Sequence, residues 1–260
     1  MLGPMSTDTA AAATALLRLH TDPAILTVVN VWDSISAKVV TDLPGTTALA
    51  TASHSIAASR GYEDGENIPV DEMVEEVRRI VAATHLPVTA DLEGGYGDAA
   101  ATVRAAIAAG AVGANLEDQL KPLDEAVAQV EAVMAAAADA GVPDFVLNAR
   151  TDAFVKGAAD PLAEAVTRGR AYLEAGAPVV FVPGPLDEEQ IGTLVDAFGP
   201  QRLTVIGLPG VPSPSRLQEL GVARVSYGPL SQRVALTALA ELVEAVHADG
   251  GVPEGTRPLN

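Results

Sequence analysis

The chain has 260 residues, 48% of them hydrophobic and 19% charged, so it is long and apolar enough for a sizeable core and is not a disordered chain. Its formal net charge of -18 argues against a nucleic-acid or anionic-membrane surface, and the lack of cysteine excludes disulfides, thiolate zinc sites and a cysteine acid or nucleophile. Since no apolar run approaches the ~18 residues of a membrane span, we expect a cytoplasmic protein.

Short β-branched runs alternate with alanine-rich runs along the chain. We expect strands at 24–31, 46–52, 87–93, 113–118, 145–151, 179–184, 203–208 and 222–227. Helical patterns lie between them, at 34–42, 70–83, 98–109, 123–140, 160–175, 187–198, 213–220 and 229–247. Residues 1–12 carry no weight in this scheme, and we expect them to be disordered or an addition to the natural chain.

Eight strand-then-helix units with short connections predict a parallel sheet closed into a (β/α)8 barrel of the TIM type, an α/β fold. Asp33 and Asp187 stand where helix N-caps belong, which supports the predicted helices. No linker or low-complexity break divides the sequence, so we expect a single domain over 1–260. An open doubly wound sheet is the alternative, but no G-x-G-x-x-G motif follows any predicted strand.

Three neighbouring predicted strands end in charged residues. Side chains two apart share a face of a strand, so Asp91 and Glu93 are expected to face the barrel interior, as are Glu117 and Arg150 on the next two strands. Three confined carboxylates raise one another's pKa unless a cation neutralises them, and all-oxygen ligands suit Mg²⁺ or Mn²⁺. The guanidinium suits a substrate carboxylate. The sequence therefore predicts a site for a metal and a small anionic acid.

Other polar residues near this mouth allow two interpretations. His54 is either a general acid or a packing residue. The Tyr96 hydroxyl either contacts the substrate or the ring packs within its loop. Trp32 either forms the floor of the pocket or belongs to the core. Asp98 is expected to cap a helix. Asp118 is on the strand face opposite to that of Glu117, so we do not expect it to point into the mouth. Surface positions are expected for Lys121, His20, His85 and His247.

Six segments, in order within residues 24–230, resemble the isocitrate lyase / phosphoenolpyruvate mutase superfamily. They are NVWDSISAKVV (30–40), GYEDGE (61–66), TADLEGGYGD (89–98), GANLEDQ (113–119), NARTDAF (148–154) and VFVPG (180–184). The resemblance implies a (β/α)8 barrel, commonly a tetramer of helix-swapped pairs. It also implies that Mg²⁺ holds an enolpyruvate, glyoxylate or oxalate-like enolate while a C–C or C–P bond is made or broken.

The resemblance assigns metal roles to three residues. Asp91 matches the direct metal ligand of the family, and Glu93 and Glu117 match the acids that hold metal-bound waters.

Four further residues match substrate-binding positions of the family. Arg150 matches the carboxylate-binding arginine, and Asp64 matches an acid that helps to position substrate and metal. Ser53 and His54 fall where the family uses backbone N–H groups to bind substrate oxygens, an oxyanion-hole role.

The loop after the fourth predicted strand departs from the family. The lyase branch carries a cysteine acid there, and the mutase branch has a longer gating loop with a lysine. Here the segment 116–126, LEDQLKPLDEA, is short and lacks cysteine, and Lys121 has a different offset from Glu117. The residue that decides the reaction is therefore not identified by the resemblance.

These features predict a Mg²⁺-dependent lyase that cleaves a C–C bond of a small 2-oxo or 2-hydroxy di- or tricarboxylic acid. Decarboxylation of an oxaloacetate-like acid and retro-aldol cleavage of a methylisocitrate- or malate-like acid both fit. C–P chemistry on phosphonopyruvate or phosphoenolpyruvate is an alternative. An alternative of another class is a non-catalytic protein that binds Mg²⁺ and a 2-oxo acid. We expect a homo-oligomer, either a dimer or a tetramer.

Overall fold

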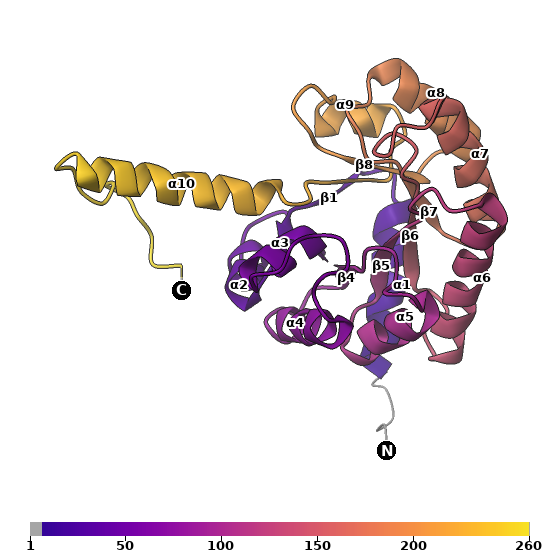
Figure 1. Ribbon diagram of the computed structural model, residues 1–260, viewed down its shortest axis with the longest axis horizontal. Helices are drawn as coiled ribbons and strands as arrows, with labels where there is room; N and C mark the ends of the chain where they lie inside the picture. The colour runs from indigo at the N-terminus through magenta and orange to yellow at the C-terminus, as the bar shows by residue number, and fades with distance from the viewer. Residues whose placement is uncertain (1–6, 260) are drawn as a thin grey trace.

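The computed structural model describes residues 7–259 (Figure 1). In this part of the chain the strands are β1 Leu26–Val28, β2 Asn30–Val31, β3 Leu49–Thr51, β4 Val88–Asp91, β5 Gly113–Glu117, β6 Val146–Arg150, β7 Val179–Phe181, β8 Leu203–Ile206 and β9 Arg224–Ser226. The helices are α1 Thr7–Thr21, α2 Ser34–Thr41, α3 Ser53–Ser59, α4 Val70–Ala82, α5 Ala99–Ala108, α6 Leu123–Asp139, α7 Pro161–Glu174, α8 Glu188–Phe198, α9 Pro214–Glu219 and α10 Leu230–His247.

All strands are parallel and form one sheet in the order β1-β9-β8-β7-β6-β5-β4-β3-β2. The sheet closes through the first predicted strand, which is interrupted at Val29. Its β1 half pairs with β9, and its β2 half pairs with β3. The predicted (β/α)8 barrel is therefore confirmed, with its first strand split into two segments, and the open doubly wound alternative is wrong.

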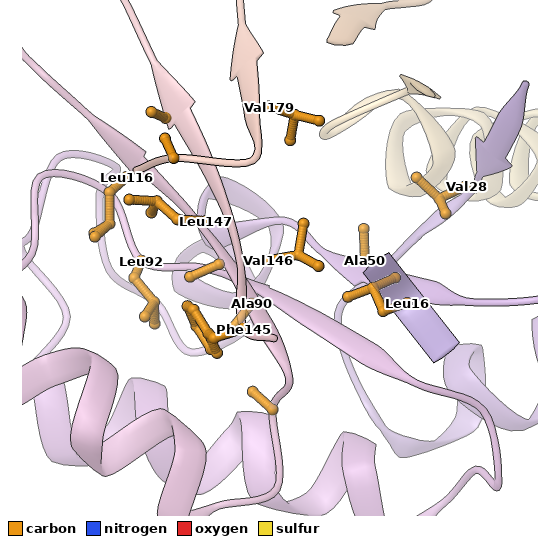
Figure 2. Packing of buried hydrophobic residues seen from close by; sticks show 14 of the residues in the cluster. Leu16, Val28, Ala50, Ala90, Leu92, Leu116, Phe145, Val146, Leu147 and Val179 are labelled. Carbon is orange, nitrogen blue, oxygen red and sulfur yellow. The ribbon is translucent and has the colours of Figure 1, made fainter. Parts of the chain in front are cut away.

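The hydrophobic core lies between the strands and the surrounding helices. Ala90, Leu92, Leu116 and Leu147 are buried there (Figure 2), each next in sequence to a polar residue of the other face. This alternation is the period of two that a strand imposes. It places the apolar set under the helices and leaves the polar set for the barrel interior.

Helix α1 packs at the amino ends of the strands and was not predicted. Leu16 is fully buried, and a Cβ built on Gly113, the first residue of β5, would lie 3.0 Å from its Cδ2 atom. Residues 7–12 belong to this alanine-rich helix, so the prediction of disorder is wrong for them, since alanine favours a helix most strongly. Residues 1–6 lie outside the described residues. His20 near its end is fully buried, so its predicted surface position is also wrong.

Three predicted helix caps are confirmed. The side chains of Asp33, Asp98 and Asp187 each accept a hydrogen bond from a backbone N–H in the first turn of α2, α5 and α8, respectively. Each cap satisfies a donor that has no partner within the helix. Asp98 therefore serves the helix rather than the mouth, as predicted.

Helix α10 leaves the barrel and projects away from it (Figure 1). Its exposed apolar side chains are Val234, Leu236, Leu239, Val243 and Val246. His247, at its end, is exposed as predicted. Within residues 7–259, no helix has both the length and the apolar character that crossing a membrane requires.

Candidate active site

A cavity of about 450 Å³ opens at the carboxyl ends of the strands, where a barrel of this type places its functional groups. Its lining includes five of the predicted site residues, namely Ser53, His54, Asp64, Asp91 and Arg150. The other four, Glu93, Glu117, Trp32 and Tyr96, do not line it.

Asp91 is the last residue of β4, and its backbone and side chain are both anchored. Its N–H donates to Thr51 Oγ1 at 2.9 Å, and its Oδ2 accepts from the N–H and the hydroxyl of Ser53 at 3.0 and 2.8 Å. Within residues 7–259, Oδ1 receives no protein hydrogen bond and stays free for a ligand. The N–H of Ser53 donates to Asp91 in this structure, and the oxyanion-hole role of the Ser53 and His54 amides stays a prediction.

Glu117 and Arg150 are opposite each other on β5 and β6 and form an ion pair, with Nη1 and Oε2 2.9 Å apart. Arg150 Nε also donates to Asp152 Oδ1 at 2.7 Å. Burial raises the pKa of Glu117 to about 7, although Arg150 opposes this rise. Burial lowers the pKa of Arg150, but Glu117, Asp152 and Asp91 outweigh it and raise the pKa overall. Arg150 is thus a fixed cation at the cavity wall.

Glu93 does not continue the inward face of β4. The strand ends at Asp91, and Glu93 adopts a left-handed backbone with φ of 51°. Its carboxylate accepts from the N–H of Glu66 and, at 3.1 Å, from the hydroxyl of Tyr96. Burial raises its pKa despite these bonds. The strand is therefore shorter than the sequence pattern indicated, and Glu93 is placed by the loop after β4 rather than by strand alternation, near Asp91 and Asp64.

The glycines after β4 allow this loop to approach the next one closely. A Cβ on Gly94 would lie 2.4 Å from Gln119 Nε2, and one on Gly95, where φ is 96°, would lie 2.5 Å from the Cβ of Ala99. A side chain on Gly94 would have to move the Gln119 side chain, whereas one on Gly95 would clash with the start of α5 at a φ that favours glycine.

Asp118 points away from the cavity and supports the site from behind. Its Oδ2 accepts from the Tyr172 hydroxyl at 2.6 Å and from Arg168 Nη1 at 3.2 Å, while its Oδ1 accepts from the N–H of Asp152 at 3.0 Å and of Leu120 at 2.9 Å. The parity argument against Asp118 as a mouth residue is confirmed. Its bonds hold Asp152, which in turn holds Arg150.

Three other predicted residues lie elsewhere. Trp32 lines a separate, mainly apolar groove beside Ile35 and Ser231. Tyr96 is half-buried and binds Glu93. Lys121 Nζ lies 3.3 Å from Gln129 Oε1, outside the cavity.

The cavity also contains residues that the sequence did not single out as site residues. Asn115 shares the inward face of Glu117, so strand parity could have identified it. Arg233 comes from α10, where the sequence gives no signal because its position depends on where the helix leaves the barrel. One wall is apolar and consists of Phe154, Phe181, Pro183, Ile206 and Leu208.

The donor chemistry fits a hard divalent ion that keeps several waters. Among the described residues, no three His, Cys, Asp or Glu side chains gather closely enough to enclose a metal ion. Asp91 offers one free carboxylate oxygen, and Asp91 is near enough to Glu117 to raise the pKa of that carboxyl. Mg²⁺ is commonly held by one or two carboxylates and water, whereas structural zinc requires four protein ligands.

The sequence and the fold match known proteins. The family model for phosphoenolpyruvate phosphomutase matches residues 16–247. An oxaloacetate decarboxylase of Paraburkholderia xenovorans is 30% identical over 86% of this chain and 78% of its own length. A 2,3-dimethylmalate lyase of Eubacterium barkeri is 33% identical over 84% of this chain and 80% of its own length. A solved structure from Burkholderia cenocepacia J2315, provisionally assigned as a phosphonomutase, is 42% identical and has a TM-score of 0.85. The match covers 91% of this chain and 98% of that protein. The chain therefore belongs to the phosphoenolpyruvate mutase family, within the isocitrate lyase / phosphoenolpyruvate mutase superfamily.

Proposed function

We propose that this protein is a metal-dependent lyase that cleaves a C–C bond of a small 2-oxo or 2-hydroxy di- or tricarboxylic acid. The observation that carries the proposal is the presence of Asp91, with one free carboxylate oxygen, and Arg150, a fixed guanidinium, in one cavity. The names of the relatives support it, since oxaloacetate and 2,3-dimethylmalate are both small dicarboxylic acids.

Each polar residue then has a role. Asp91 would hold Mg²⁺ or Mn²⁺ directly, and Glu117 and Glu93 would hold its waters. When bound, the metal supplies Lewis-acid stabilisation of negative charge on substrate oxygens. Arg150 binds a substrate carboxylate, and its ion pairs with Glu117 and Asp152 fix the direction of the guanidinium before the substrate arrives. Arg233, on the α10 side of the cavity, is a second cation for a distal carboxylate.

The apolar wall favours C–C over C–P chemistry. Phe154, Phe181 and Leu208 can accommodate an alkyl group but cannot donate hydrogen bonds to a phosphonate. Lys121, the nearest match to the mutase lysine, is outside the cavity beside Gln129. An acid with an alkyl substituent, such as a 2-alkylmalate, fits this wall better than phosphonopyruvate.

The test is a Mg²⁺-dependent turnover screen over oxaloacetate, 2-alkylmalates, methylisocitrate and phosphonopyruvate, together with calorimetric binding of oxalate, which mimics the enolate. We expect turnover of a dicarboxylic acid. We also expect Asp91→Asn to weaken oxalate binding by at least about 100-fold, because it removes the charge that holds the ion. Asp98→Asn, at the exposed cap of α5, is the matched control and leaves binding unchanged.

Three other results would contradict parts of the proposal. Oxalate binding without any turnover would identify a non-catalytic binding protein. Turnover of phosphonopyruvate alone would identify C–P chemistry. Unchanged oxalate binding in Asp91→Asn would show that the site lies elsewhere.

We also propose a cytoplasmic homo-oligomer. The absence of cysteine agrees with that compartment. The projecting helix α10, with apolar side chains that its own barrel does not cover, supports association with another copy of the chain (Figure 1).

A further inference from the structure

A histidine and a carboxylate face each other at the rim of the cavity. His54 is the second residue of α3, and Asp64 lies in the loop between α3 and α4. His54 Nδ1 is 3.4 Å from Asp64 Oδ2, and the two side chains are 42% and 53% exposed. Both line the same cavity as Asp91 and Arg150, so a substrate held by those two residues lies within the space that His54 also borders.

His54 differs from the other histidines of the chain in its position. There are four histidines and no cysteine in the sequence. His20 is buried at the amino ends of the strands, His85 lines a pocket that also includes Pro87 just before β4, and His247 ends the projecting α10. Among these four, His54 is the histidine that borders the cavity.

Resting on the proposed function, we propose that His54 is the catalytic acid–base that exchanges a proton with the substrate, and that Asp64 is its positioning residue. Because Nδ1 faces Asp64, we assign the proton exchange to the other ring nitrogen, Nε2. A carboxylate on one imidazole nitrogen fixes the orientation of the ring, which is the arrangement used by histidine acid–base catalysts. This pair takes the place of the cysteine acid that the chain lacks.

In both bond cleavages, every proton that is taken up or released has a source and a destination. In a decarboxylation, the C–C bond to the departing carboxylate breaks, its electron pair forms an enolate, and the enolate carbon takes the proton of Nε2, which solvent then replaces. In a retro-aldol cleavage, neutral Nε2 takes the hydroxyl proton while the C–C bond breaks. This gives a carbonyl and an enolate, and the imidazolium returns the proton to the enolate carbon.

Charged groups on several elements act on His54. Asp64, Asp91, Arg150 on β6 and Arg233 on α10 are the charged residues that line the same cavity as His54. Glu93 lies near both Asp91 and Asp64, and Glu66 binds the adjacent loop. Asp64 is the carboxylate whose oxygen lies 3.4 Å from the ring, so its removal takes away the contact that orients His54.

The test uses a partial reaction that does not require the natural substrate. The full-length protein is incubated with Mg²⁺ and pyruvate in D₂O, and loss of the methyl signal is followed by proton NMR. His54 Nε2 removes a methyl proton to give the enolate and returns a deuteron. We expect His54→Gln to slow the exchange by about 100-fold while oxalate affinity stays within about twofold of the wild type. His85→Gln, at the other end of the barrel, is the matched control and exchanges normally.

Asp64→Asn separates positioning from packing. We expect exchange to slow by about 10-fold, because the ring loses the carboxylate that orients it. Asp64→Glu keeps a carboxylate beside the ring and is expected to recover most of the lost rate. A purely structural role would give equal losses in the two variants.

The outcomes distinguish failure of this inference from failure of the proposed function. If oxalate does not bind the wild type, the proposed site is wrong and the proton role falls with it. If oxalate binds but wild-type exchange is absent, or if His54→Gln exchanges like the wild type, the acid–base role of His54 is wrong and the metal–arginine site stands.

Discussion

The two ends of the barrel hold buried charge in opposite ways. At the mouth, every charged side chain of the central group has a partner, since Asp91 binds Ser53 and Arg150 binds both Glu117 and Asp152. Beneath it, Arg224 at the start of β9 is fully buried, and none of its guanidinium nitrogens has a hydrogen-bond partner within residues 7–259. His20 of α1, also fully buried, has an unpaired Nε2.

The charged groups at the mouth are oriented to bind a ligand, whereas the buried charge of Arg224 lowers the stability of the fold. Paired groups at the mouth are oriented before a substrate arrives, and the ion pairs offset part of the desolvation that burial imposes on Glu117 and Arg150. Arg224 has no such compensation, and burial lowers its pKa to about 10 despite the attraction of Asp91. The comparison predicts that substitutions behind the mouth destabilise the fold, whereas removing the charge of Arg224 stabilises it.

The largest expected effect is that of Asp118→Ala, behind the mouth. This change leaves Arg168 and the Tyr172 hydroxyl buried without their acceptor. Breaking a buried pair of this kind costs about 3–5 kcal/mol of unfolding free energy. Urea denaturation measures the loss, and Asp98→Ala is the control, an exposed helix cap whose removal costs about 1 kcal/mol. Equal losses in the two variants would show that the buried network contributes no more than a cap.

Arg224→Met is expected to have a smaller effect of the opposite sign. Methionine is unbranched and can occupy the space of the arginine stem without burying a charge. We expect the unfolding free energy to rise by about 2 kcal/mol in urea denaturation, since replacing buried ions with apolar side chains is often stabilising. Arg104→Met, on the exposed side of α5, changes it by less than about 0.5 kcal/mol. A destabilised Arg224→Met variant would mean that the guanidinium has a bound internal partner.

The sequence predicted the barrel and the two central residues of the site because strand alternation is local. Asp91 and Arg150 lie at the ends of regular strands, where the period of two holds and points their side chains to the interior. The N-caps at Asp33, Asp98 and Asp187 are equally local, because each depends on a side chain and the helix turn that follows it.

The errors arose where position depends on tertiary structure. Glu93 follows the end of β4 in a left-handed conformation, so strand alternation does not determine where its side chain points. The burial of His20 depends on α1 packing at the amino ends of the strands, which an alanine-rich segment does not reveal by composition. The place of Arg233 in the cavity depends on the direction in which α10 leaves the barrel.

The smallest expected effect concerns the pH dependence that His20 gives to stability. Burial, helped by Arg224, lowers the pKa of His20 from 6.5 to about 3, so the folded state keeps the ring neutral while the unfolded state takes up a proton below pH 6.5. Its contribution to stability is therefore present above pH 6.5 and is lost as the pH falls from there toward 3. Between pH 7 and about pH 5.5 this loss is about 1 kcal/mol.

His20→Gln removes the titrating group, and its amide N–H can still donate to the Leu16 carbonyl oxygen that accepts from Nδ1 at 2.9 Å. The difference in unfolding free energy between wild type and variant should shrink by about 1 kcal/mol over that interval, in favour of the variant at low pH. Taking this difference removes the contributions of Glu117 and the other carboxyls, which titrate in both proteins. If the difference is independent of pH, His20 is protonated in the folded state and Arg224 does not act on it as a close, desolvated cation.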